Sequence, residues 1–124
     1  MSGGFLNDTA RNCAVAGVVA LAATGYALAN DNTPMTAGVV MERMEVRERY
    51  GYIAGIVEGL AYARFRKDTL AAGSKDERGM QCIYDWFYAD KEAMFVRIGQ
   101  AFTKYPEHFP STLIAVMVKK ECGE

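Results

Sequence analysis

A stretch without any charged residue spans residues 12–29, near the start of this 124-residue chain. It is rich in alanine and valine, and Ala27 and Ala29 occupy the two small-residue positions of an A-x-A cleavage site. A basic residue, Arg11, precedes the stretch, and this order is typical of a secretory signal peptide. We therefore expect residues 1–29 to be removed after export.

Two other interpretations of the same stretch remain. Its apolar part, residues 13–29, approaches the ~17–25 residues that cross a bilayer, so an uncleaved anchor in the inner membrane is the second. A buried helix of a soluble domain is the third. Alanine and glycine favour the membrane less than leucine and isoleucine do, which supports the cleaved signal. We expect residues 30–124 to form a periplasmic domain, with membrane contact only if residues 13–29 are retained.

The cysteines bear on the same question. Cys13 lies within the predicted signal, so the exported domain keeps Cys82 and Cys122. Two cysteines in a small exported domain are typical of one disulfide, which would stabilise the fold by about 3–4 kcal/mol; two buried thiols are the alternative. A zinc site is not expected, because the chain has a single histidine and no C-x-x-C pair. We expect no metal and no cofactor.

The rest of the chain has a helical pattern. No proline interrupts residues 35–67, and further helices are predicted over residues 80–89, 91–105 and 112–122. No run alternates strictly enough to indicate a hairpin. The sequence therefore predicts an all-α domain, a compact bundle of about four helices whose last helix is tied to the middle by the disulfide.

Several residues are predicted to start or stop these helices or to face the core. Thr36, Asp90 and Ser111 are the expected N-caps, and Gly73 and Pro106 the expected stops. The segment 68–79 is expected to be a loop in which Ser74 or Asp76 caps the next helix. The side chains expected to face inward in the last two helices are Phe95, Ile98, Phe102, Tyr105, Leu113, Val116 and Met117.

A stripe at helical spacing marks the first long helix. It consists of Tyr52, Gly55, Ile56, Gly59, Leu60 and Ala63. Glycine inside a soluble helix costs about 1 kcal/mol relative to alanine. We therefore expect Tyr52, Gly55 and Gly59 to be helix-packing residues that let another element, or a second copy in a homodimer, approach the backbone closely.

Charge limits the choice of partners. The formal net charge is −1, which gives no electrostatic basis for binding nucleic acid. The mixed charges of residues 42–49 are typical of a solvated helix face, and the connections at 68–79 and 105–110 are also expected to be exposed. If the chain binds a protein, the candidate contact residues are Glu42, Glu45, Arg49, Asp76, Glu107 and His108.

Little in the sequence indicates catalysis. Histidine beside a carboxylate, as in His108 beside Glu107, is a combination that serves as a general base, but no nucleophile with a recognisable motif accompanies it. The alternative is that His108 is a surface residue of the loop. The carboxylates of Glu58, Asp85, Asp90 and Glu92 form no motif by spacing. The aromatic residues 84–88 are either a binding patch or a core segment. We do not expect an enzyme.

The order of these features resembles the Rap/Tai family of small exported proteins. The resemblance is carried by an apparent signal, a Y-x-x-G-x-x-x-G helix, a mid-chain cysteine, a helix ending in "YPEH", and a last helix that ends in cysteine. It implies a compact, all-helical, periplasmic domain in which Cys82 and Cys122 are structural cysteines. It also implies a protein partner, since the family includes type VI secretion immunity proteins that bind and block a peptidoglycan-cleaving amidase toxin.

Two other functions fit an exported helical domain. One is a small periplasmic stress chaperone that exposes apolar surface in acid. The other is an accessory subunit of an envelope complex, held in the membrane by residues 13–29.

Overall fold

The computed structural model describes residues 32–124. The predicted signal or anchor lies outside the described residues. The helices are α1 (Ala37–Arg43), α2 (Val46–Ala72), α3 (Arg78–Tyr88), α4 (Lys91–Lys104) and α5 (Pro110–Cys122). The described part of the chain contains no strand, which confirms the all-α prediction with five helices in place of about four.

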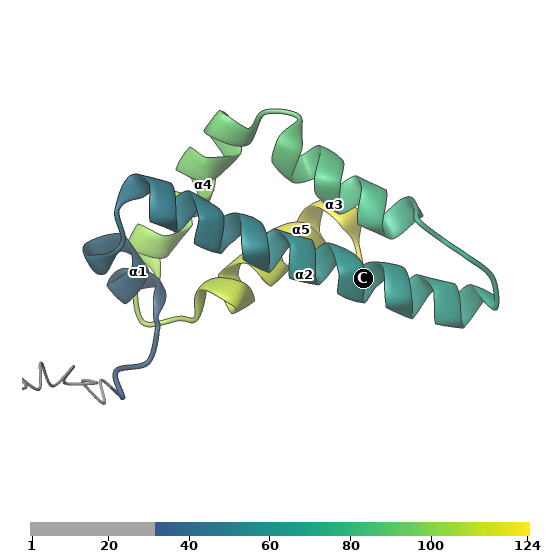
Figure 1. The fold of residues 1–124 in the computed structure, drawn as a ribbon, viewed down its shortest axis with the longest axis horizontal. Coiled ribbons are helices and arrows are strands. Elements are labelled where there is room, and N and C mark those ends of the chain that lie inside the picture. Colours follow the sequence, from purple (N-terminus) through teal and green to yellow (C-terminus); the bar gives the residue numbers. More distant parts are fainter. Residues whose placement is uncertain (1–31) are drawn as a thin grey trace, which may run out of the picture. The chain divides into compact units, whose positions relative to one another are not determined.

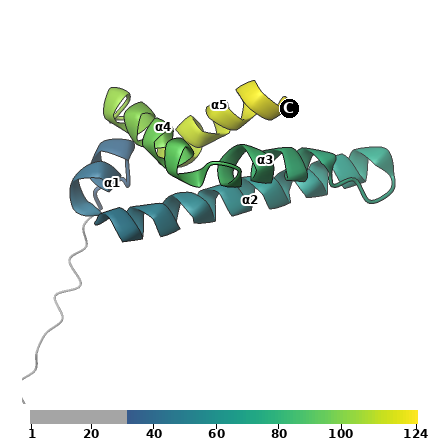
Figure 2. The ribbon, with the colours of Figure 1, turned by 90° about the horizontal axis from the view of Figure 1, so that it is seen from above.

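The helices pack around one core. Figure 1 shows α2 running the length of the domain with α3 folded back along it. Helix α1 packs on α4, and α5 contacts α2, α3 and α4. Figure 2 shows α2 along one side of the domain and α4 and α5 on the other. The largest side chains that this arrangement buries completely are Phe87, Phe102, Ile53, Ile83, Ile98 and Ile114.

The predicted first helix is two helices. Met44 has an extended backbone, with φ −92° and ψ 130°, and this residue ends α1. The backbone N–H of Glu45 donates to Oε2 of Glu48 at 3.2 Å, which satisfies one of the free donors at the start of α2. Arg49 then donates to the carbonyl of Met41 at 3.3 Å and satisfies an acceptor at the end of α1. Local hydrogen bonds at the break thus replace those of a continuous helix.

The predicted caps are mostly confirmed. The side chains of Thr36 and Asp90 accept from the backbone N–H groups of Val39 and Ala93. Gly73 follows α2 with φ 69°, the left-handed conformation that glycine adopts without strain. Because α2 continues to Ala72 and α3 begins at Arg78, the expectation of a loop over residues 68–79 is wrong for residues 68–72 and 78–79. The N-cap position of α3 is held by Glu77, so the prediction of Ser74 or Asp76 there is also wrong.

Helix α5 starts two residues earlier than an N-cap at Ser111 predicts. Phe109 is its N-cap and Pro110 lies in its first turn, so Ser111 is inside the helix. Proline suits this place because its fixed φ is helical and its missing N–H would have no helical partner there. The inward face of α5 is made by Ile114 and Val118, whereas Val116 is 48% exposed, so the prediction that Val116 faces the core is wrong.

The buried face of α2 also differs from the predicted stripe. Its buried residues are Ile53, Val57 and Ala61, whereas Gly55 and Gly59 are exposed. A Cβ added at either glycine would have no neighbour within 4 Å. The prediction that another element of the described chain approaches these glycines is therefore wrong. Tyr52 is half-buried against the core.

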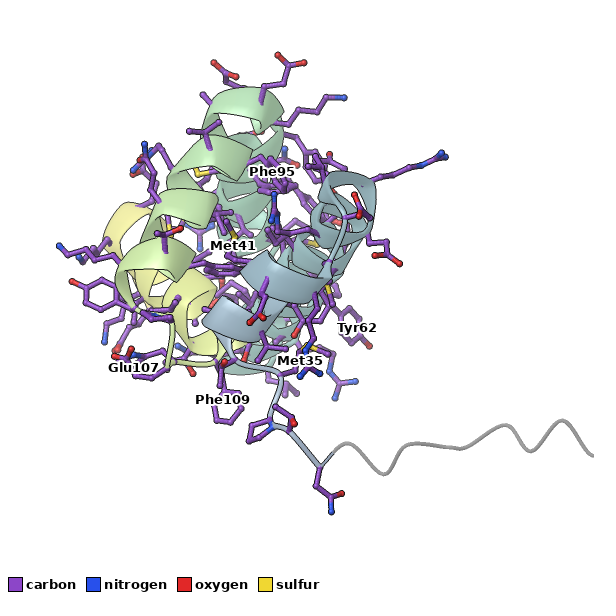
Figure 3. The ribbon with its side chains drawn as sticks, turned by 90° about the vertical axis from the view of Figure 1, so that its left-hand side faces the viewer. Met35, Met41, Tyr62, Phe95, Glu107 and Phe109 are labelled. Carbon is purple, nitrogen blue, oxygen red and sulfur yellow. A yellow bond between two sulfur atoms is a disulfide. The ribbon has the colours of Figure 1, made fainter. Side chains whose placement is uncertain are left out.

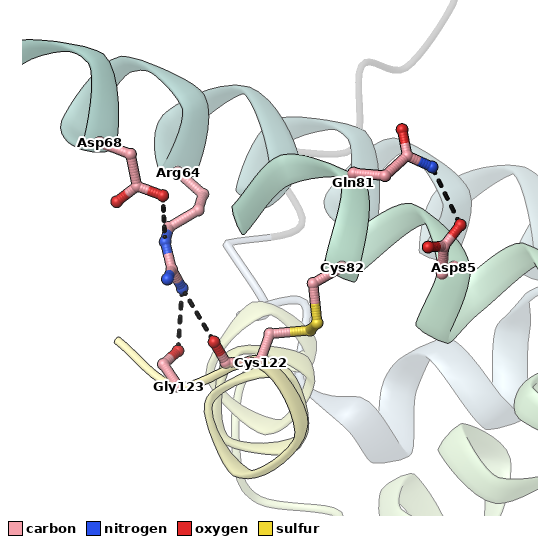
Figure 4. Close-up of a disulfide and its surroundings, with 7 residues drawn as sticks. All are labelled: Arg64, Asp68, Gln81, Cys82, Asp85, Cys122 and Gly123. Atoms are coloured by element: carbon pink, nitrogen blue, oxygen red, sulfur yellow. Dashed lines mark hydrogen bonds and ion pairs between the residues drawn. A yellow bond between two sulfur atoms is a disulfide. The ribbon is translucent and has the colours of Figure 1, made fainter. Parts of the chain in front are cut away.

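The predicted disulfide joins Cys82 of α3 to Cys122 of α5, with 5.8 Å between the Cα atoms. Figure 4 shows Arg64 of α2 beside it. The Nε of Arg64 donates to Asp68 Oδ2 at 2.7 Å, and its Nη1 donates to the carbonyls of Gly123 at 3.0 Å and Cys122 at 3.4 Å. The guanidinium therefore meets the negative end of the α5 dipole, where a cation is stabilising.

A glycine outside the predicted stripe makes room for this contact. Gly79 of α3 is buried, and a Cβ there would lie 2.7 Å from Cγ of Arg64. Real Cβ atoms do not approach so closely, so any larger residue would displace the arginine. The close approach of α2 and α3 thus occurs at Gly79 and not at Gly55 or Gly59.

Candidate functional site

The candidate contact residues fall in three places. Glu42, Glu45 and Arg49 lie at the junction of α1 and α2, and Glu107 and His108 lie in the connection between α4 and α5. Figure 1 shows these two places toward the same end of the domain and the α2–α3 connection, which holds Asp76, at the opposite end. One compact surface therefore cannot include all six.

The connection from α4 to α5 is held against the start of α1. The backbone N–H of Ala37 donates to the carbonyl of His108 at 2.8 Å, and that of Gly38 donates to the carbonyl of Pro106 at 2.9 Å. A Cβ at Gly38 would lie 3.0 Å from Cβ of Pro106, so this glycine permits the close approach. The connection is therefore fixed in place by backbone contacts.

Glu107 and His108 lie on the outside of this connection. His108 Nδ1 is 3.0 Å from Glu107 Oε1, and the imidazole stands edge-on to the ring of Tyr105 at 5.8 Å. Side chains of both Glu107 and His108 are largely exposed. In Figure 3, Glu107, Phe109 and Met35 gather along one edge of the molecule. The arrangement is that of a surface pair beside exposed apolar groups.

Arg49 is engaged inside the domain. Besides its bond to Met41, its guanidinium carbon lies 5.7 Å from the centre of the Phe95 ring, within reach of a cation–π interaction. Figure 3 shows Met41 and Phe95 between α1 and α4, where they line a hollow of about 480 Å³. Arg49 thus ties the start of α2 to both neighbouring helices, while Glu42 and Glu45 are exposed.

Asp76 has a local structural role. Its carboxylate pairs with the guanidinium of Arg78 at 2.7 Å and also accepts from the backbone N–H of Arg78 at 3.1 Å. These hydrogen bonds lower the pKa of Asp76 to about 2. Its own N–H donates to the hydroxyl of Thr69 at 3.1 Å. The residue therefore fixes the start of α3 and its link to α2.

The aromatic segment is divided between core and surface. Trp86 and Phe87 are buried, whereas Tyr84 is half-buried and Tyr88 is 41% exposed. Both tyrosine hydroxyls donate to Glu58 of α2, at 2.9 and 2.8 Å. The bond to Glu58 raises the pKa of Tyr84, and burial followed by the same carboxylate raises the pKa of Tyr88 to about 12.

Among the carboxylates considered for catalysis, Glu58 accepts from the two tyrosines, and Asp85 and Asp90 have structural partners of their own. Asp85 accepts from the side-chain amide of Gln81 at 2.9 Å, and Asp90 caps α4. Among residues 32–124, no group of three or more His, Cys, Asp or Glu side chains is arranged to hold a metal ion. Within the same residues, none of the helices combines the length and apolar character needed to cross a membrane.

A groove between α4 and α5 was not foreseen from the sequence. It has a volume of about 690 Å³, and we call it the α4–α5 groove. Leu113, Val116 and Met117 form part of its apolar lining, and the basic residues Arg97, Lys104 and Lys120 also line it. The signal for it was present, because positions 97, 100, 101 and 104 share one helical face, but the inward direction expected for Val116 concealed it.

Comparison with known proteins does not assign the chain to a family. No family model, no curated protein and no solved structure matches it. The resemblance to the Rap/Tai family therefore rests on the residues of this sequence.

Proposed function

We propose that this chain is an exported protein that acts by binding another protein in the periplasm. The observation that carries the proposal is the placement of exposed apolar side chains. Val96, Tyr105, Phe109 and Val116 are each at least 41% exposed and belong to α4, α5 or the connection between them. Val96 borders the hollow beside Met41 and Phe95, and Val116 borders the α4–α5 groove, so these side chains offer apolar surface to a protein partner.

The way this region is built supports the same proposal. The backbone bonds from Ala37 and Gly38 fix the connection between α4 and α5, so Phe109 is held outward on a rigid support. A preorganised contact surface loses little conformational entropy on binding. An aromatic side chain presented in this way is the kind of residue that dominates binding energy at interfaces.

The disulfide supports the proposed location in the periplasm. Disulfides persist in oxidising environments such as the bacterial periplasm and are rare in the cytosol. The bridge between Cys82 and Cys122 closes a loop of 40 residues. An exported domain of this size gains stability from such a closure that its small core alone would not provide.

The target that the resemblance suggests is a peptidoglycan-cleaving amidase delivered into the periplasm. We propose inhibition by occupation of the amidase cleft, as in type VI secretion immunity proteins. This mechanism requires only a stable, preorganised surface on the immunity protein.

Capture from the envelope tests the proposal. The full chain, expressed with its own N-terminal segment, is recovered from the envelope, and its intact mass is measured with and without reduction. We expect the mass of a chain that begins at Asn30 and thiols that react only after reduction. We also expect a co-purifying protein whose amidase activity on isolated peptidoglycan falls when this chain is added.

Other outcomes separate the alternatives. A full-length mass would favour the membrane-anchored accessory subunit and contradict the cleaved signal. Suppression of client aggregation at low pH, without a specific partner, would favour the stress chaperone. A captured partner without amidase activity would retain the binding function and overturn the immunity role.

A further inference from the structure

We propose that the α4–α5 groove is the docking site for an acidic, amphipathic helix of the partner protein. The inference rests on the proposed function, because it names the surface and the chemistry of the partner. Helices α4 and α5, whose side chains line the groove, lie on the side of the domain away from most of α2 (Figure 2), and the lining of the groove does not include Cys82, Cys122 or Arg64.

The apolar lining is the first part of the argument. Leu113 and Met117 are half-buried and pack against the core, whereas Val116 between them is 48% exposed. These three residues lie on one face of α5, at spacings of three and four. An exposed apolar ridge of this spacing matches the apolar face of another helix, as in helix-in-groove recognition.

The charges around this lining are the second part. Within residues 32–124, Arg97 and Lys120 form no ion pair with the protein, and Lys104 interacts only with the ring of Tyr105, at 5.2 Å. The domain as described holds thirteen basic and thirteen acidic residues, so it is neutral and these cations are a local excess. A partner that brings carboxylates to them is electrostatically complementary.

Helix dipoles explain only part of this excess. Lys104 and Lys120 lie in the last turns of α4 and α5, where cations are favoured in any helix. Arg97 is in the middle of α4 and has no such reason. The helix dipole does not account for the exposure of the apolar side chain of Val116 either.

The spacing of the cations indicates an extended ligand. Arg97 and Lys104 are seven residues apart on α4, which corresponds to roughly 10 Å along the helix axis. Carboxylates two turns apart on an amphipathic helix match this spacing, and helices α4 and α5 are long enough to hold about four turns of it.

One carboxylate of the protein reduces the positive charge of the groove. Glu121 of α5 also lines it, beside Lys120, and Glu107 is paired with His108 nearby. The balance of the groove-lining side chains remains positive, because Arg97, Lys104 and Lys120 outnumber Glu121. The orientation of the bound helix should therefore place its carboxylates toward α4.

Binding of two designed peptides tests the inference. Both are labelled helices of about 14 residues, which is four turns, with leucines on one face; one carries flanking glutamates and the other carries lysines at the same positions. We expect the acidic peptide alone to bind the oxidised protein in fluorescence anisotropy, and its affinity to fall with added salt. Equal binding of both peptides, or of neither, would overturn the charge argument.

Variants of the protein locate the binding site. We expect Lys104→Glu combined with Lys120→Glu to weaken the acidic peptide about tenfold or more, since two attractions become repulsions. Val116→Asp should weaken it independently through the apolar lining. The matched control is Arg66→Glu combined with Lys91→Glu, which changes the net charge equally outside the groove. An equal loss in the control would overturn the placement.

Two further arms separate other occupants. Binding of wild-type protein to phosphatidylglycerol vesicles, with no binding of the acidic peptide, would overturn the inference in favour of an anionic membrane. Dimerisation in analytical ultracentrifugation that Val116→Asp abolishes would overturn it in favour of a second copy. Circular dichroism of each variant must match the wild type, and the exposed positions chosen make this the expected result.

The envelope capture distinguishes this inference from the function beneath it. Loss of the captured partner by the groove variant, and not by the control variant, supports the groove. If both variants retain the partner, protein binding stands and the groove inference fails. If the wild type captures no partner while the acidic peptide still binds in the groove, the groove stands and the proposed function fails.

Discussion

Side chains fasten one end of the domain, whereas backbone contacts fasten the other. At what we call the disulfide end, Cys82 is bonded to Cys122, and Arg64 joins Asp68 to the C-terminal carbonyls of α5 (Figure 4). At what we call the loop end, the connection between α4 and α5 is held on α1 by the backbone bonds of Ala37 and Gly38.

The difference leaves the two ends with different surfaces. At the disulfide end, charged side chains form ion pairs within the domain: Arg64 is paired with Asp68, and Asp76 with Arg78. At the loop end and along the adjoining groove, aromatic and apolar groups such as Phe109 are exposed. A chain whose stability is supplied at one end can leave the other end free to make contacts.

Loss of the disulfide is expected to have the largest effect. Cys82→Ser combined with Cys122→Ser should lower the free energy of unfolding by about 4 kcal/mol, because the bridge restricts a loop of 40 residues in the unfolded chain. Urea denaturation with tryptophan fluorescence measures the change. Reductant should destabilise the wild type to the same extent and leave the double variant unchanged; an effect on the double variant would contradict the assignment.

Gly79 is expected to be the more sensitive of the glycines. Gly79→Ala should cost about 1–3 kcal/mol, because its Cβ displaces Arg64 and breaks the hydrogen bonds to Cys122 and Gly123. Thermal denaturation and urea titration measure this. Gly55→Ala is the matched control and should stabilise by roughly 0.5–1 kcal/mol through helix propensity alone. Equal effects at both positions would contradict the packing described.

Gly38 tests the loop end in the same way. Gly38→Val should destabilise by about 1–2 kcal/mol, since the added methyl groups push against Pro106, whose carbonyl accepts from residue 38. The control is Gly51→Val, which adds the same side chain at a position where the new Cβ has no neighbour within 4 Å. The free energy of unfolding should fall more for Gly38→Val, and the reverse order would show that the loop end is not tightly held.

The sequence predicts features that depend on neighbouring residues. Thr36 and Asp90 cap helices, and Gly73 ends one, because each needs only a backbone N–H or a conformation within a few positions. The pairing of Cys82 with Cys122 followed from the expected export and from the even number of cysteines in residues 30–124. The caps depend on residues a few positions apart, and the disulfide on a count of cysteines. Both can therefore be predicted without knowledge of how the helices pack.

Features that depend on packing were missed for a physical reason. Counting glycine as apolar placed the buried stripe on Gly55 and Gly59, which are two residues away from Ile53 and Val57 of the true face. Two residues correspond to a rotation of about 200° around a helix, which is nearly the opposite side. In a helix with apolar residues on several faces, periodicity cannot choose between such stripes. The need for glycine at Gly79 depends on an arginine that is fifteen positions away.

The candidate site shows the same difference between features that depend on neighbouring residues and features that depend on packing. Glu107 and His108 were placed on an exposed connection because prolines flank it, and the structure confirms that exposure. Arg49 was expected in a solvated face, but it is held over Phe95, a residue far away in the sequence. The α4–α5 groove requires two helices to meet, so the shared face of positions 97, 100, 101 and 104 could indicate only one of its walls.

The smallest expected effect concerns the tyrosines that join α2 to α3. Deprotonation of Tyr84 or Tyr88 would place a phenolate beside the carboxylate of Glu58, so that carboxylate holds both pKa values above the ordinary 10.0. Glu58→Gln should lower both, because the amide still accepts a hydrogen bond but carries no charge. Tyr88 should stay above 10.0, since burial is the larger cause of its shift.

Titration of the phenolate absorbance, with ring-labelled tyrosine resolved by NMR, measures these values. The raised pKa also makes a prediction about stability. A group whose pKa is raised in the folded state stabilises fully below its unfolded pKa, so the contribution of Tyr88 should be present below pH 10.0 and lost as the pH rises through about 12. Glu92→Gln, which removes an exposed carboxylate of α4, is the control and should move neither midpoint. If Glu58→Gln also moves neither, Glu58 is not what holds α3 to α2 at this point.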